Sequence, residues 1–206
     1  MSLIIKKLDQ VAYEPTWHSM QKFTAQRDTA TQDEVWLCEH SPVFTQGRHG
    51  RSEHILNPQD IDVVHTDRGG QVTYHGPGQL MAYFLWDLKR LKIGPKALVC
   101  VMEQTLIDTL AEFGIIAMRK AGAPGIYVKG DKIASLGLRI KKGLSYHGLA
   151  LNVDMDVTPF SYINPCGYEA LGITQISEVV PGVKMLAVEQ AFVAKLRVHR
   201  AALESA

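Results

Sequence analysis

The feature of this chain that most constrains its fold is a long helical pattern set between segments typical of strands. Apolar side chains recur on one face of Lys96–Phe113, and Gly114 directly afterwards is typical of a helix C-terminus. Two further amphipathic helices are expected at Pro15–Ala30 and Met185–Leu203. Apolar composition and a glycine turn predict strands at Leu3–Leu8, Glu34–His40, Gln79–Leu88, Ile115–Met118, Gly125–Val128, Lys132–Ile140 and Leu144–Val153. Strands interrupted by helices, with several hairpin-like pairs, favour an α+β fold with a mixed β-sheet and flanking helices.

The composition is typical of a globular domain. The chain has 206 residues, of which 46% are hydrophobic and 21% are charged, and its formal net charge is +1. No repeat, linker or low-complexity segment divides it, so we expect one domain over residues 1–206. The near-neutral charge gives no general reason to expect nucleic acid binding. The apolar run at the start is short and no segment reaches the length of a membrane span, so neither a signal peptide nor a membrane partner is expected.

The three cysteines differ in their surroundings. Their odd number and the lack of CxxC spacing argue against a disulfide framework and favour a reducing compartment, the cytoplasm. Cys38 and Cys100 lie within predicted apolar elements, which predicts buried, inert thiols. Cys166 instead lies in the sequence INPCGY, where Pro165 and Gly167 hold it on a bend. That setting suits a nucleophile, and it also suits an ordinary tight turn.

A glycine-rich segment is the second unusual stretch. Arg68–Gln79 reads RGGQVTYHGPGQ, and its glycines allow the backbone to lie close to another group. The amides of Gly69 and Gly70 can face an acyl carbonyl or a phosphate, and Arg68 can add charge. Neither a Walker loop nor a dinucleotide fingerprint occurs in the chain. The alternative is a wide surface loop, as is also expected for Ser41–Pro58.

The eight histidines show no metal-ligand spacing such as HExxH, so no metal site is expected. His75 and His147 each stand between a tyrosine and a glycine. Both are expected to be hydrogen-bonded structural histidines, and the functional alternative is that both line one pocket.

Three segments together resemble the octanoyltransferases of lipoate biosynthesis: RGGQVTYHGPGQL, then GDKIASLGLRI followed by SYHGLALNV, then INPCGY. Their order and separation match as well, over roughly Val35 to Ile176. The resemblance implies the fold of the biotin and lipoate protein ligases. It also implies an acyltransferase that moves octanoyl from octanoyl–acyl carrier protein to a lysine of a lipoyl domain, as the first step of endogenous protein lipoylation. The acceptors implied are the lipoyl domains of 2-oxo acid dehydrogenase E2 subunits and the H protein of the glycine cleavage system.

The resemblance also assigns residues. Cys166 is implied to carry the acyl group as a thioester, and Lys132 to tune it. The substrate contacts implied are Arg68, Gly69, Gly70, Gln71, Val72, Thr73, Tyr74, His75, Ser135, Leu136, Gly137, Gly148, Leu149 and Ala150. The chemistry is consistent, because a cysteine with a free pKa near 8.5 needs a cationic or basic neighbour to react as a thiolate at neutral pH. The pairing of Lys132 with Cys166 rests on the resemblance, since the sequence gives no distance between the two residues. Taken alone, Lys132 is most simply a solvated lysine. The nearby Gly130 would leave space for its side chain to turn toward the thiol.

The free-energy changes of the octanoyl transfer that the resemblance implies predict a reaction without ATP or a cofactor. Exchange of one thioester for another is close to isoenergetic, and the following transfer to an amine runs downhill. An octanoyl chain that buries about seven methylene or methyl groups at ~0.8 kcal/mol each would gain roughly 5 kcal/mol from an apolar slot.

Three other functions remain open from the sequence. An ATP-dependent lipoate or biotin ligase would form an acyl-adenylate and would not need Cys166. A cysteine hydrolase would use Cys166 with His75 or His147 and release the acyl group to water. A binding module for carrier proteins or lipoyl domains would leave all three cysteines structural.

Overall fold

A seven-stranded sheet forms the centre of the molecule. The computed structural model describes residues 3–167 and 171–204. Across the sheet the strands are ordered β1 (Ile4–Val11), β2 (Glu34–His40), β6 (Gln79–Leu85), β10 (Leu144–Asn152), β9 (Asp131–Lys141), β8 (Ala123–Val128) and β7 (Met118–Lys120). β1 pairs with β2 in parallel, and the remaining neighbours are antiparallel. The mixed sheet of the predicted α+β fold is therefore present.

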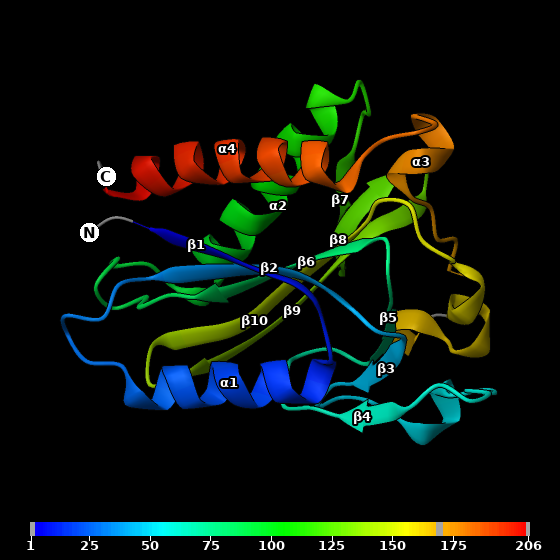
Figure 1. Ribbon diagram of the computed structural model, residues 1–206, viewed down its shortest axis with the longest axis horizontal. Helices are drawn as coiled ribbons and strands as arrows, with labels where there is room; N and C mark the ends of the chain where they lie inside the picture. The colour runs from blue at the N-terminus through cyan, green and yellow to red at the C-terminus, as the bar shows by residue number, and fades with distance from the viewer. Residues whose placement is uncertain (1–2, 168–170, 205–206) are drawn as a thin grey trace.

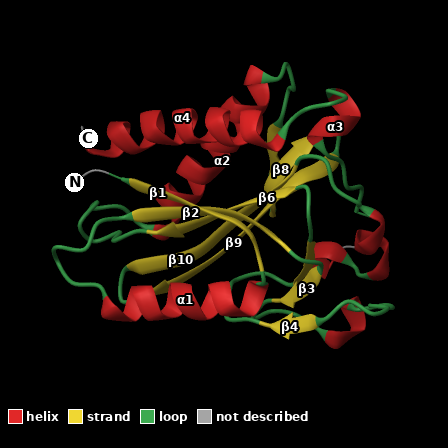
Figure 2. Cartoon of the chain, viewed as in Figure 1, coloured by secondary structure: helices red, strands yellow, loops and turns green. Residues whose placement is uncertain are grey.

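Helices cover both faces of this sheet (Figures 1 and 2). The helices α2 (Pro95–Glu112) and α4 (Met185–Glu204) lie on one face, and α1 (Tyr13–Gln26) lies on the other. Side chains alternate along a strand, so Leu37 and Phe84 join the core under α2 and α4. Their neighbours Trp36 and Tyr83 join the core that Met20 of α1 completes. Among the helices in the described ranges, none is both long and apolar enough to cross a bilayer.

A smaller sheet adjoins the α1 side of the central sheet (Figure 1). Its strands are ordered β4 (Val63–His65), β3 (Val43–Gln46) and β5 (Val72–His75). It has a core of its own, in which Phe44 and Tyr74 pack against Phe160. The short helical turns η1 (Ser52–His54), η2 (Thr158–Tyr162), η3 (Pro165–Gly167) and α3 (Ile176–Val179) belong to the connecting segments.

Several predicted boundaries are wrong. The segment predicted as loop at Ser41–Pro58 contains β3 and η1, and the glycine-rich segment contains β5. The edge strand β7 begins at Met118, where the predicted strand ends. Helix α1 begins at Tyr13, because Pro15 is tolerated in the first turn of a helix. It ends at Gln26, four residues before the predicted end, and the predicted strands 79–88 and 144–153 end at Leu85 and Asn152.

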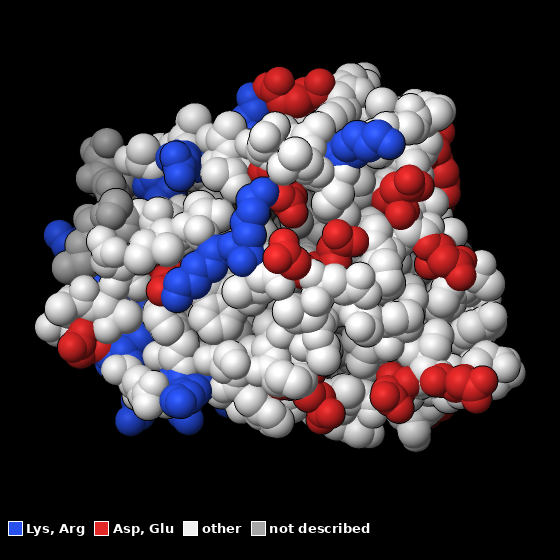
Figure 3. Space-filling view, in the orientation of Figure 1, with Lys and Arg blue, Asp and Glu red and all other residues white. Residues whose placement is uncertain are grey.

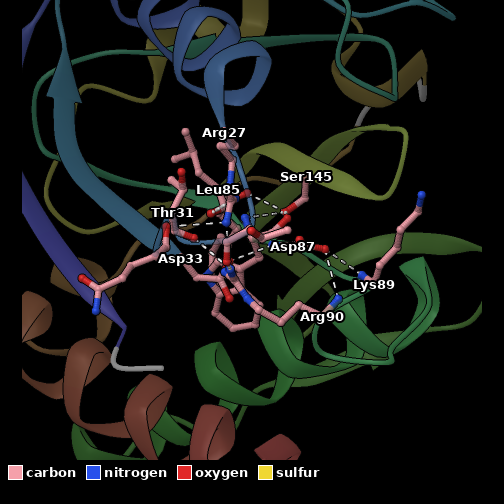
Figure 4. Close-up of polar contacts among 12 residues, drawn as sticks. Arg27, Thr31, Asp33, Leu85, Asp87, Lys89, Arg90 and Ser145 are labelled. Carbon is pink, nitrogen blue, oxygen red and sulfur yellow. Dashed lines mark hydrogen bonds and ion pairs between the residues drawn. The ribbon is translucent and has the colours of Figure 1, made fainter.

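A buried ionic cluster joins distant parts of the chain (Figure 4). Asp33, next to β2, accepts hydrogen bonds at Oδ1 from Arg27 and Arg90, both at 2.6 Å. Its Oδ2 accepts from Arg200 of α4 at 3.0 Å. Arg27 follows α1 and Arg90 follows β6, so one carboxylate connects both helical layers to the sheet.

Candidate active site

Most of the predicted substrate contacts surround one cavity between α1, the small sheet and the β9–β10 hairpin. The empty space in it is about 480 Å³ with the open mouth included. The predicted residues in its wall are Arg68, Gly70, Gln71, Val72, Thr73, His75, Ser135, Leu136, Gly137, Gly148, Leu149 and Ala150. We call it the acyl cavity, after the acyl chain that the sequence resemblance implies. The sequence did not indicate the wall residues Tyr13, Met81 and Tyr83, which occur within ordinary helical and strand patterns.

Two predicted contacts lie elsewhere. The side chain of Tyr74 is buried in the core of the small sheet, against Phe44 and Phe160. Gly69 lines a second, adjoining cavity. The expectation that Gly69 offers its amide to a substrate is wrong, because this N–H donates to the Leu138 carbonyl at 2.9 Å and docks the glycine-rich segment onto β9.

Arg68 is fixed from inside the protein. Its guanidinium donates to the carbonyl and hydroxyl oxygens of Thr45 and to the Gly69 carbonyl. Thr45 Oγ1 also lies 3.1 Å from Nε2 of His75, whose Nδ1 lies 2.8 Å from the Gln79 Oε1. Since an amide oxygen only accepts, Nδ1 carries the proton and Nε2 accepts from Thr45. Burial lowers the pKa of His75 to about 3, so the ring is neutral at neutral pH.

A second polar group lies around Asp67, which directly precedes Arg68. Its carboxylate accepts hydrogen bonds from Trp17 Nε1 at 3.0 Å, His147 Nε2 at 2.8 Å and the Tyr146 hydroxyl. Two consecutive β10 side chains reach the same carboxylate, and His147 adopts a left-handed backbone with φ of +60°. Burial alone would raise the pKa of Asp67, but the hydrogen bonds from His147 and Tyr146 outweigh it and lower the pKa below its usual range.

His147 lies in the wall of the acyl cavity, as does His75. Burial lowers its pKa, although Asp67 opposes that effect, so the neutral ring donates through Nε2. Its Nδ1 is buried and has no hydrogen-bond partner among the described residues. Of the two histidines, His147 is therefore the one whose second nitrogen can accept a proton.

Lys132 is not the solvated lysine that its sequence alone suggests. It lies in β9, is only 2% exposed, and donates from Nζ to the Pro124 carbonyl at 3.0 Å. The aliphatic end of the side chain passes Gly125, where a Cβ would lie 2.9 Å from Lys132 Cε. The expected spacer, Gly130, has no such neighbour, so Gly125 provides the room instead.

The adjoining cavity connects Lys132 to the glycine-rich segment. It has a volume of about 800 Å³ with its open mouth included, and its wall includes Lys132, Pro124, Gly69, Gly70 and Gln71. Gly70, Gln71, Leu136 and Gly137 belong to both cavities. Lys132 therefore faces a space that is separated from the acyl cavity by a shared wall.

Cys166 lies in the turn η3, and its side chain is outside the part of the structure that is described. Gly167, next to it, has φ of +77°, as the predicted bend requires. A Cβ on Gly167 would lie 2.5 Å from the Gln71 side-chain amide. The backbone of the cysteine turn thus reaches a residue of the shared wall, while the pairing of Cys166 with Lys132 stays a prediction.

The other cysteines are described, and only one behaves as predicted. Cys38 is buried in the core facing α1, as expected, whereas Cys100 is exposed on α2. Within the described ranges, no group of three or more His, Cys, Asp or Glu side chains is arranged to hold a metal ion.

Comparisons with known proteins agree with the fold and with the resemblance. Residues 12–197 match the family model described as lipoyl protein ligase A/B catalytic domain. An octanoyltransferase of Hahella chejuensis is 59% identical over 194 residues, covering 94% of this chain and 87% of its own. A lipoate-protein ligase A bound with ATP superposes with a TM-score of 0.80 at 14% identity, over 98% of this chain and 86% of its own. A biotin protein ligase from Aquifex aeolicus superposes with a TM-score of 0.57 at 12% identity, over 98% of this chain and 69% of its own. The predicted fold class is confirmed.

Proposed function

Because the chain belongs to the lipoyl protein ligase A/B family and, within it, to the octanoyltransferases, we propose that it transfers octanoyl from octanoyl–acyl carrier protein to a lipoyl-domain lysine. The chain is an acyltransferase of lipoate biosynthesis. The proposed acceptors are the lipoyl domains of 2-oxo acid dehydrogenases and of the glycine cleavage H protein.

The proposed reaction has two steps that pass through a thioester on Cys166. In the first, Lys132 takes the thiol proton, the sulfur attacks the donor's carbonyl, and the carrier's thiolate leaves with the proton returned from Lys132. In the second, the acceptor amine attacks the new thioester. The bond to Cys166 breaks, the amide forms, and Lys132 passes the proton of the amine to the departing Cys166 thiolate. No nucleotide enters either step.

The placement of Lys132 carries this proposal most directly. A buried lysine faces a cavity whose wall includes Gln71, and a Cβ on Gly167 of the cysteine turn would lie 2.5 Å from the Gln71 side chain. The acyl cavity lies across the same wall, and the apolar side chains of Leu149, Met81 and Leu136 are among its lining. An octanoyl chain in that cavity could extend its carbonyl end to the shared wall, on whose other side Lys132 lines the adjoining cavity.

The thioester is tested by intact-mass measurement after exposure to octanoyl–acyl carrier protein. Wild type should gain one octanoyl group, and the adduct should persist in Cys38→Ala and in Cys100→Ala. An equal gain in Cys166→Ala would remove Cys166 from the mechanism. Release of octanoate to water without an acceptor would favour the hydrolase. In that reaction His147 would be the base, since both nitrogens of His75 are already bonded.

Independence from ATP separates this proposal from a ligase. Octanoyl-lysine should form on an apo lipoyl domain with the acyl carrier donor alone, and EDTA should not slow it, because the donor is already activated. Mass spectrometry of the lipoyl domain gives the readout. Comparable turnover from free octanoate plus ATP would establish the ligase instead.

A further inference from the structure

A basic cavity lies behind the acyl cavity, between α1 and the far end of the β9–β10 hairpin. It encloses about 1180 Å³ with its open mouth included, and Asp67 and Tyr146 form part of its wall. Asp67 and Tyr146 also hold His147, which lines the acyl cavity. One polar cluster therefore contributes side chains to the walls of both cavities.

The charge of this wall is unbalanced. Arg139, Lys141 and Lys142 line it, and none of the three has an ion-pair partner among the described residues. The acid in the wall, Asp67, already accepts three hydrogen bonds. A further arginine, Arg27, is paired with Asp33. Figure 3 shows Lys and Arg side chains gathered at the lower left, over the end of α1.

Buried donors in the wall lack partners. Thr24 of α1 is 5% exposed, and its hydroxyl makes no hydrogen bond to any described residue. The Nε of Arg139 is likewise buried and unpaired within the described ranges, although the Arg139 guanidinium is bonded to Tyr146. A buried donor without a partner is costly, and both residues line the cavity, so turning either side chain toward an acceptor bound there would remove that cost.

We propose that this cavity binds a phosphate group. A phosphate presents several strongly accepting oxygens at once, which suits a guanidinium, a hydroxyl and two flexible ammonium groups better than a planar carboxylate does. Its charge would also balance the excess of Arg139, Lys141 and Lys142. The phosphate has two possible sources: a phosphodiester in the arm of the acyl donor, or a free phosphorylated molecule. The first source rests on the proposed function, and the second does not.

Binding is tested with inorganic phosphate on the full chain at constant ionic strength, with chloride replaced step by step. Backbone and Arg139 Nε–H resonances of ¹⁵N-labelled protein should shift in a saturable way. Affinity should fall at least tenfold in Lys141→Gln/Lys142→Gln, whose side chains are exposed and tolerate change, and also in Arg139→Gln. Lys184→Gln removes an exposed lysine before α4 and should bind as wild type does. A shift that does not saturate, or equal affinity in the double variant, would overturn the site.

The source is tested by kinetics of the wild-type enzyme. If the donor's phosphodiester occupies the cavity, inorganic phosphate raises KM for the carrier-bound donor without changing kcat, and leaves an octanoyl thioester without phosphate unaffected. Saturable binding without inhibition of either donor assigns the site to a free phosphorylated molecule. Inhibition of both donors would place the phosphate in the acyl cavity and refute the proposal. The binding measurement does not depend on turnover, so it stands even if octanoyl transfer fails.

Discussion

The Asp67 carboxylate holds three side chains in place beside the acyl cavity. Trp17 comes from α1, while Tyr146 and His147 are neighbours on β10. Because His147 Nε2 donates to this carboxylate, its Nδ1 is the unprotonated nitrogen. Asp67 therefore determines both the position and the tautomer of a histidine in the wall of the acyl cavity.

Replacing Asp67 should change how stability depends on pH. The pKa of Asp67 is lower in the folded protein than in the unfolded chain. Its contribution to folding stability is therefore complete above the ordinary aspartate pKa near 3.8 and is lost as the pH falls below that pKa. Asp67→Asn should be less stable than wild type at pH 6, and the difference should shrink toward pH 3. Urea unfolding between pH 3 and 6 measures it, with the exposed Asp60→Asn as control. A difference that stays constant over this range would contradict the role of the charge.

Lys132 should be required as a proton carrier and not only as a charge. An arginine stays protonated, whereas an amine can take a proton and return it. Lys132→Arg and Lys132→Ala should both lose on the order of 10²–10⁴-fold in transfer rate. The exposed Lys129→Arg is the matched control. Near-normal transfer in Lys132→Arg would reduce Lys132 to an electrostatic role, and near-normal transfer in Lys132→Ala would exclude it from the mechanism.

The role of Lys132 is tested further by measuring the rate of Cys166 alkylation as a function of pH in the same Lys132 variants. The exposed thiol of Cys100 would react as well, so the assay needs a Cys100→Ala background.

At the scale of elements, the wall of the acyl cavity depends on close contact between β6 and β10. A Cβ on Gly148 would overlap the Ala82 carbonyl oxygen on the neighbouring strand. The strands meet this closely only because residue 148 has no side chain.

Gly148→Ala should therefore destabilise the sheet itself, by about 1–3 kcal/mol as for other overpacked sites. At Gly137 a Cβ would lie 3.1 Å from the Gly69 carbonyl and 3.2 Å from Arg68, so Gly137→Ala should cost less stability. Chemical denaturation of the two variants beside wild type gives the comparison. Equal losses would show that β10 can shift away from β6.

How far the elements could be predicted from the sequence depends on what stabilises each one. The helix predicted at Lys96–Phe113 is α2 within one residue at each end, because its apolar stripe is a local pattern. The strands β3 and β5 are four residues each and exist through pairing with one another, almost thirty residues apart. Such pairing leaves little trace in a local sequence.

In the candidate site, too, the sequence predicted local patterns but not contacts between distant segments. Cys38 could be placed in a core because its whole strand is apolar, while Cys100 lies off the buried stripe that Leu98 and Met102 define on α2. Sequence motifs indicated most of the residues in the wall of the acyl cavity. They gave no distance between segments, so Asp67, Thr45 and Gly125 were missed.

At the scale of the whole molecule, Asp33 connects the layers. Arg27, Arg90 and Arg200 approach it from the end of α1, from the loop after β6 and from α4. Removing the carboxylate would leave buried guanidinium groups without their counter-charge, which typically costs about 3–5 kcal/mol.

Asp33→Asn should lower the free energy of unfolding by that amount, measured by urea denaturation. The exposed pair of Arg51 and Glu53 is the control, since Glu53→Gln should change stability by less than about 1 kcal/mol. A loss in Asp33→Asn no larger than in the control would show that the arginines find other partners.

The polar cluster shared by the two cavities has a thermodynamic consequence. Asp67 and Tyr146 line the basic cavity, and the His147 that they hold lines the acyl cavity. An occupant of one cavity that displaces this cluster alters the affinity of the other cavity by some factor. Linkage then requires the reverse effect to have the same factor. If acylation weakens the grip on the donor's arm, a bound arm must in turn weaken retention of the acyl chain, so loading the enzyme and releasing the spent carrier would be one coupled event.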